Sequence, residues 1–205
     1  MTSHSDRLET FSELSDIFPS LIPLKGKQPI EEGWQYYCEN TRLYDERDFK
    51  GYNAGIPGGP ANGVIVLDMD DREIFDAWSQ QKGFELPIDT RIHRTGSGKY
   101  HYFYQYPNNG MRYGNRSLKS AGIDIRGIGG QVVGPGSIHP GTGKPYRVYH
   151  DLPVAPAPQW LPLSAGTLQG RKKLKAQRKA LREEISHVQS LIRIAQEALE
   201  DGLYD

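Results

Sequence analysis

Hydrophobic residues follow two kinds of spacing in the first part of the chain. Apolar residues recur every three positions across residues 8–17, which predicts a helix, and Pro19 ends the pattern. Residues 63–68, Gly-Val-Ile-Val-Leu-Asp, form an apolar run of the kind found in strands buried on both faces. Helical spacing returns over residues 72–81, and Gly83 is expected to end this second helix.

The middle of the chain alternates polar and apolar residues, a pattern typical of strands. Residues 90–94 and 100–104 alternate on either side of a turn of small residues, which predicts a β-hairpin. Two further strands are expected at 122–126 and 131–133, because both segments are short and apolar. Residues 107–118 are polar and are predicted to form a loop.

The character of the chain changes beyond residue 165. Apolar residues between 181 and 199 alternate spacings of four and three, which predicts one long amphipathic helix with a coiled-coil type of seam. We therefore expect two parts, a globular domain over residues 1–165 and a helical extension over residues 166–205.

Composition narrows the class of protein. The chain has 205 residues, 37% of them hydrophobic, which is enough for one good core and a short appended element. Cys38 is the single cysteine, so an intramolecular disulfide and a multi-cysteine zinc site are excluded. We expect a cytoplasmic protein of a bacterial or phage-infected cell, because no apolar run approaches the length of a membrane span. The 25 basic side chains balance 25 acidic ones, so charge must be interpreted locally.

Acidic residues follow the buried strand directly. Asp68 and Asp70 are two apart, so on extended backbone both carboxylates project to the same face. Such a pair suits Mg²⁺, which leaves positions open for water and phosphate. Asp124 is the best candidate for the further carboxylate that a two-metal site needs. The alternatives are helix capping, expected at Asp71, and an ion pair between Asp124 and Arg126.

Two segments rich in glycine carry groups that bind phosphate. Residues 95–101, Thr-Gly-Ser-Gly-Lys-Tyr-His, combine backbone amides, hydroxyls, an ammonium and an imidazole. Residues 134–139 place Ser137 and His139 beside a glycine-rich bend. An ordinary turn is an open alternative for both segments. The spacing of a P-loop is absent, as are a Gly-x-Ser-x-Gly elbow and histidines at zinc-ligand spacing.

Taken in their order along the chain, the acidic and glycine-rich segments resemble motifs of the archaeo-eukaryotic primase superfamily, in particular of its bifunctional primase-polymerase domain. Three motifs, at residues 66–70, 97–103 and 122–127, carry the resemblance, which covers about residues 20–162. It implies an α+β fold, with an RRM-like antiparallel or mixed sheet and helices joined to a smaller α/β unit. At residues 134–136, Gly-Pro-Gly stands where relatives often have consecutive prolines.

The resemblance also implies a function, that of a template-dependent nucleotidyltransferase in the replication of a phage, plasmid or other mobile element. The enzyme would join dNTPs, and NTPs as a second possibility, on a DNA template and primer. Asp68, Asp70 and Asp124 would hold two Mg²⁺ or Mn²⁺ ions, and His101 would contact the incoming triphosphate. The further candidates for nucleotide contact are Ser97, Lys99, Arg126, Ser137 and His139.

Partners and alternatives follow from the same residues. A helicase or a C-terminal priming domain of a longer replication protein is the expected protein partner. A two-metal nuclease is one alternative function. A single-stranded nucleic-acid-binding module is another, with bases stacked on Tyr100, Tyr102 and Tyr104.

The C-terminal helix has its own open questions. Residues 171–182 carry seven lysines and arginines, and we favour a solvated face for them over a surface that follows a template backbone. The apolar seam is expected to pack on the core or on a further domain rather than on a second copy. A monomer without membrane contact is therefore predicted.

Overall fold

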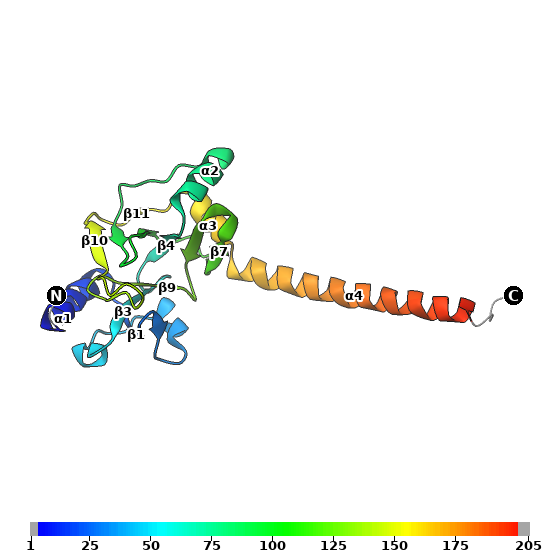
Figure 1. Cartoon of the computed structure of the whole chain (residues 1–205), viewed down its shortest axis with the longest axis horizontal. Helices are drawn as coiled ribbons and strands as arrows, with labels where there is room; N and C mark the ends of the chain where they lie inside the picture. The colour runs from blue at the N-terminus through cyan, green and yellow to red at the C-terminus, as the bar shows by residue number, and fades with distance from the viewer. Residues whose placement is uncertain (1–3, 201–205) are drawn as a thin grey trace. The chain divides into compact units, whose positions relative to one another are not determined.

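The structure, a computed structural model, describes residues 4–200. Its contacts divide the chain into two compact units, residues 1–167 and 168–205. The first unit contains two β-sheets with short helices around them, and the second contains one long helix (Figure 1). This architecture confirms the predicted α+β class and the long C-terminal helix.

The larger sheet runs through the centre of the first unit. Its strands are β4 (Val64–Met69), β5 (Ile92–Arg94), β6 (Tyr100–Gln105), β7 (Arg116–Leu118), β8 (Ile123–Arg126), β10 (Arg147–His150) and β11 (Ala155–Pro156). The strand order is β10-β5-β6-β4-β8-β7, and β11 runs parallel to β6. All other pairs in this sheet are antiparallel.

A second, four-stranded sheet has the order β2-β1-β3-β9 and is antiparallel throughout. Its strands are β1 (Ile22–Lys25), β2 (Gln28–Pro29), β3 (Asn53–Pro57) and β9 (Gln131–Val133). The helices of the first unit are α1 (His4–Ile17), η1 (Trp34–Cys38), η2 (Glu46–Phe49), α2 (Arg72–Lys82), η3 (Lys119–Ala121) and α3 (Trp160–Ala165).

The apolar run in β4 is explained by two hydrophobic clusters, one on each face of the larger sheet. Ile65 and Leu67 belong to one cluster, which includes side chains of α2 and α3. Val64 and Val66 belong to the other, which includes side chains of α1 and β3. Because side chains alternate along a strand, Asp68 continues the face of Val64 and Val66.

The predicted elements are present, with two differences. The hairpin is confirmed as β5 and β6, and the segments at 122–126 and 131–133 are strands, but these last two belong to different sheets. The predicted loop at 107–118 is wrong at its end, where Arg116–Leu118 form β7. This strand lies at the edge of the sheet and is mostly exposed, so it lacks the apolar alternation that predicts a strand.

Helix α2 begins at the predicted residue, ends one residue later than predicted and has the predicted cap. Asp71 accepts a hydrogen bond from the backbone amide of Ile74 at 3.0 Å, and Gly83 ends the helix with φ of 66°. We expect Asp71→Ala to lower the free energy of unfolding by about 1 kcal/mol, because an amide loses its acceptor. Chemical denaturation of this variant and of Glu73→Ala, a change in the same helical turn, tests the cap. Equal losses of unfolding free energy in the two variants would contradict the capping role of Asp71.

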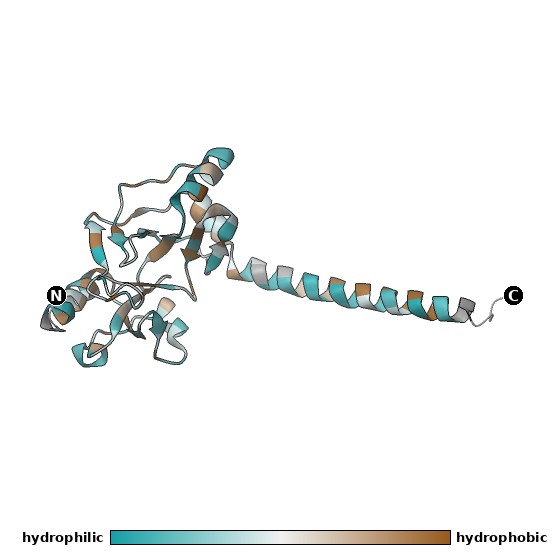
Figure 2. Cartoon of the chain, in the orientation of Figure 1, coloured by the Kyte–Doolittle hydropathy of each residue, from teal (hydrophilic) through white to brown (hydrophobic). Residues whose placement is uncertain are grey.

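The second unit is α4 (Leu168–Glu200), a single helix as predicted. Hydrophobic positions recur along a mostly hydrophilic ribbon, in agreement with an amphipathic helix (Figure 2). The side chains of Arg171 and Leu199 and all of residues 201–205 lie outside the described residues. The expected partner of the apolar seam stays a prediction. Across residues 4–200, no helix is both long and apolar enough to cross a membrane.

Candidate active site

The register of the larger sheet aligns three polar side chains across its centre. Asp68 in β4 lies opposite His101 in β6 on one side and opposite Asp124 in β8 on the other. Directly opposed residues of antiparallel strands present their side chains on the same face. Asp70 follows the end of β4, where its backbone amide donates a hydrogen bond to the carbonyl of Gly122 at 2.9 Å.

These side chains line a cavity of about 450 Å³ between the two sheets. The larger sheet and its hairpin turn contribute Asp68, Asp70, Thr95, Ser97, Lys99, His101, Asp124 and Arg126. The smaller sheet and its turn contribute Lys27, Gln131, Val132 and Val133, and Tyr146 completes the wall. The structure thus brings together all three predicted acids, His101 and three of the five further candidates, Ser97, Lys99 and Arg126.

Two basic side chains pair with the acids. One guanidinium nitrogen of Arg126, Nη2, lies 2.6 Å from an oxygen of Asp124 and 3.1 Å from an oxygen of Asp68. The ammonium of Lys99 lies 3.0 Å from a carboxylate oxygen of Asp70. The ion pair between Asp124 and Arg126, one of the alternatives drawn from the sequence, is therefore present. These cations offset the repulsion among three neighbouring carboxylates.

Two carboxylates of the cavity converge on one cationic group. A single Arg126 nitrogen contacts both Asp68 and Asp124, so oxygens of the two acids approach one common point. Mg²⁺ needs one or two protein carboxylates and completes its shell with water and phosphate. Among residues 4–200, however, no three acidic, imidazole or thiol side chains form a ready-made metal cluster. The two carboxylates are donors of the kind that Mg²⁺ takes from proteins when substrate and water supply its other ligands.

His101 is almost fully buried beside these acids. Its Nε2 atom lies 3.5 Å from an oxygen of Asp68, and its ring stacks on Tyr146 at 6.2 Å between centroids. Burial lowers the pKa of His101 despite the opposing influence of Asp68, so the imidazole is neutral at neutral pH. Burial also raises the pKa of Tyr146 to about 12, with a further contribution from Asp68. Both rings therefore act as neutral hydrogen-bonding groups.

Two residues that were predicted to contact the nucleotide do not line this cavity. The hydroxyl of Ser137 is fully buried and accepts a hydrogen bond from the backbone amide of Ala54 at 3.0 Å. The Nδ1 atom of His139 accepts from the amides of Gly141 and Thr142 at 3.1 and 3.2 Å. Both side chains therefore hold backbone segments in place, as the tight-turn alternative expects. Contact of Ser137 or His139 with a nucleotide stays a prediction.

The structure rejects part of one alternative function. Bases were expected to stack on Tyr100, Tyr102 and Tyr104 in a single-stranded nucleic-acid-binding module. Tyr102 and Tyr104 are buried in the hydrophobic cluster under α2 and α3, and the Tyr104 hydroxyl donates to the carbonyl of Pro87 at 2.5 Å. Side chains in such positions cannot form a stacking surface for bases.

Sequence reasoning did not single out Lys27, Gln131 or Tyr146 as lining residues. The Gln131 amide donates a hydrogen bond to the carbonyl of Lys27 at 2.9 Å, which ties the turn between β1 and β2 to β9. These residues come from separate parts of the chain, and the resemblance included them only among its supporting matches, with no role in a site.

The fold and the cavity define a class of protein, an α+β domain with carboxylates and basic side chains facing each other between two sheets. The chain belongs to the family described as bifunctional DNA primase/polymerase, N-terminal, whose model matches residues 16–160. The resemblance drawn from the three motifs is thereby confirmed. Family membership places the chain among DNA primases and polymerases in general. Comparison with curated proteins gives no match.

Proposed function

We propose that this chain is a template-dependent nucleotidyltransferase, a DNA primase or DNA polymerase, that joins dNTPs with two Mg²⁺ or Mn²⁺ ions. Its setting would be the replication of a phage, plasmid or other mobile element. The observation that supports this proposal is the meeting of Asp68, Asp70 and Asp124 in one cavity with basic side chains and a buried imidazole. The larger sheet would be the RRM-like sheet of the family, and the smaller sheet part of its second unit.

The acids would hold the metal ions. Asp68 and Asp124 already converge on the Arg126 nitrogen, and Asp70 stands beside them with its carboxylate half-exposed. Bound divalent ions would neutralise phosphate charge and favour the ionised form of the attacking hydroxyl. The carboxylates of this chain would position those ions, Asp68 and Asp124 from the paired strands β4 and β8 and Asp70 from just after β4.

The basic side chains would bind the triphosphate. The cavity has three basic groups, Lys27, Lys99 and Arg126, and three acidic ones, so its formal charge is balanced. Lys99 and Arg126 pair with acids in the structure, and a guanidinium or ammonium also binds phosphate oxygens strongly. A metal-bound triphosphate offers both signs of charge and therefore complements this wall.

His101 would orient the incoming nucleotide as a neutral hydrogen-bond donor. Its Nε2 atom is the ring nitrogen beside the acids, 3.5 Å from an oxygen of Asp68, whereas its buried Nδ1 atom has no hydrogen-bond partner among the described residues. A neutral imidazole has one donor and one acceptor nitrogen, so it can donate to a phosphate oxygen without adding charge. Fixing the triphosphate in line with the attacking hydroxyl supplies much of the catalysis in phosphoryl transfer.

Primer extension tests this function directly. We expect the protein to lengthen a labelled primer on a DNA template when dNTPs and Mg²⁺ or Mn²⁺ are present, and to stop when a chelator is added. A nuclease would shorten the same primer, and a binding module would leave its length unchanged. Either of these two results, in a protein that is folded by circular dichroism, would contradict the proposal.

A further inference from the structure

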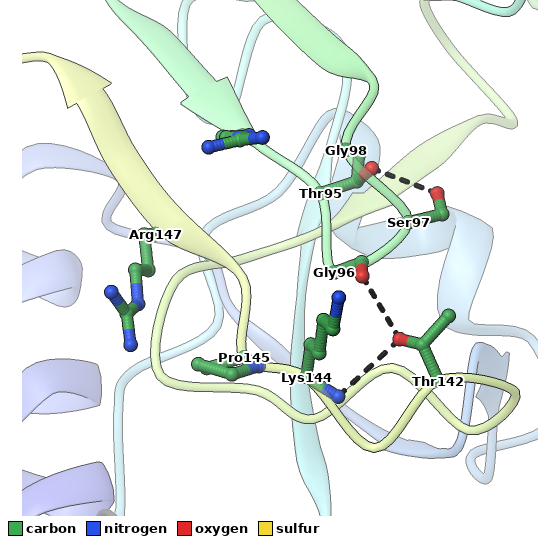
Figure 3. A pocket seen from close by; sticks show the side chains of 9 residues that line it. Thr95, Gly96, Ser97, Gly98, Thr142, Lys144, Pro145 and Arg147 are labelled. Atoms are coloured by element: carbon green, nitrogen blue, oxygen red, sulfur yellow. Dashed lines mark hydrogen bonds between the residues drawn. The ribbon is translucent and has the colours of Figure 1, made fainter.

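We propose that a second, basic cavity beside the candidate active site binds a backbone phosphate of a nucleic-acid strand. The cavity has a volume of about 400 Å³ and lies between the β5–β6 turn and the loop before β10 (Figure 3). Arg94, Lys144 and Arg147 line it, together with the Thr95–Gly98 turn and Thr142. The inference rests on the proposed function, because it names where that function would hold its DNA.

The basic side chains around this cavity lack an acidic partner among the described residues. Arg94 in β5 and Arg147 in β10 are direct cross-strand neighbours, an arrangement in which like charges destabilise a sheet. In the neighbouring cavity, Lys99 and Arg126 both pair with carboxylates. Within the described part of the chain, no carboxylate lies within 4.0 Å of the side-chain nitrogens of Arg94, Lys144 or Arg147. An anion between these three cations would relieve their repulsion, and phosphate is the anion that a DNA-handling protein meets.

The walls of the basic cavity are held in place before any ligand binds. The Thr142 hydroxyl donates to the carbonyl of Gly96 at 2.9 Å and accepts from the Lys144 amide at 3.3 Å (Figure 3). A Cβ atom on Gly96 would lie 2.4 Å from the Lys144 carbonyl oxygen and from the Cβ of His139. The turn and the loop are therefore in close contact, which lowers the entropic cost of binding.

The position of the cavity favours a nucleic-acid strand as its ligand, rather than the triphosphate of the incoming nucleotide. The two cavities share Thr95 and Ser97, so they lie on either side of one turn. Arg94 follows His93 in β5, and successive side chains of a strand point to opposite faces. His93 is paired with His101, so Arg94 faces away from the side of the sheet that carries the acids. A strand whose end reaches those acids would pass over the turn and leave another of its phosphates in the basic cavity.

Binding of single-stranded DNA by a charge-removed variant tests this site. The variant Arg94→Gln/Arg147→Gln is compared with Lys50→Gln/Lys82→Gln, which removes two exposed charges that line neither cavity. Fluorescence anisotropy with labelled oligothymidylate is measured over a range of salt concentrations, without nucleotide or divalent ions. We expect the first variant to lose about 5-fold in affinity at 0.1 M salt, and its salt slope to fall by about 0.7, since the loss of one phosphate contact on a single strand lowers the slope by about 0.7.

The control variant is expected to bind oligothymidylate much like the wild type. Equal affinities for the two double variants would overturn the proposal. Binding of dATP, measured separately by equilibrium dialysis with Mg²⁺, should be unchanged in the Arg94→Gln/Arg147→Gln variant. A fall in dATP affinity with unchanged DNA affinity would assign the cavity to the triphosphate and overturn the proposal as well. Because neither assay requires synthesis, failure of primer extension in the wild type would count against the proposed function alone.

Discussion

Replacing Asp124 with asparagine should reduce the rate of primer extension by about a thousandfold, which corresponds to about 4 kcal/mol of transition-state stabilisation. Asp124 is one of two carboxylates that converge on a common point, and a neutral amide there is a poor ligand for Mg²⁺ or Mn²⁺. The amide oxygen of asparagine can still accept the hydrogen bond from Arg126, so the fold should be kept. Single-turnover extension of a labelled primer measures the rate.

Asp76→Asn is the matched control for this change. Asp76 also pairs with an arginine, Arg72, at 2.7 Å, but its carboxylate is exposed on α2 and lines neither cavity. We expect the control to extend primers at the wild-type rate. Thermal unfolding of both variants should stay close to the wild type. Full activity in the Asp124→Asn variant would show that this carboxylate does not act in nucleotidyl transfer.

A single methyl group at Gly122 should damage both the stability of the fold and the site. Gly122 has φ of 62° at the start of β8, and its carbonyl accepts hydrogen bonds from the amides of Asp70 and Asp71, each at 2.9 Å. A Cβ atom there would lie 2.5 Å from the carbonyl oxygen of Asp71. We expect Gly122→Ala to lower the free energy of unfolding by about 3 kcal/mol, because backbone strain and a backbone clash act together.

We expect the activity of the Gly122→Ala variant to fall by more than its loss of stability explains. The hydrogen bonds from Asp70 and Asp71 to the Gly122 carbonyl tie the segment after β4 to the residue before β8, and a displacement of about 1 Å at a reacting centre can cost about a hundredfold. Gly83→Ala is the control, because Gly83 has a similar φ of 66° with nothing within 4 Å of its added Cβ. We expect this control to lose about 1 kcal/mol and to keep its activity. Similar losses in both variants would contradict the role given to the clash.

Local patterns in the sequence predicted most of the elements correctly. The unbroken apolar run became β4, because its residues enter hydrophobic clusters on both faces of the sheet. Asp71 and Gly83 were recognised as helix ends because capping depends on a few neighbouring residues. The edge strand β7 was missed, since an exposed strand needs no apolar alternation and depends on its partner β8.

The candidate acids were also found from the sequence, whereas their surroundings were not. The sequence places the three acids in recognisable motifs. Asp68 and Asp70 lie at the end of one apolar strand, and Asp124 lies within another. The contact of Arg126 with Asp68, in addition to Asp124, depends on the pairing of β4 with β8. Lys27 reaches the same cavity from the smaller sheet.

The sequence by itself determined most of the elements, the three candidate acids and the membership of a family, because each depends on residues close together along the chain or on motifs in a fixed order. Only the tertiary structure decided the register that sets Asp68 opposite Asp124 and His101. It also decided that Arg94 and Arg147 stand side by side around a separate basic cavity. The physical reason is that strand register depends on packing between distant segments, and a shift of one residue would turn every side chain to the other face.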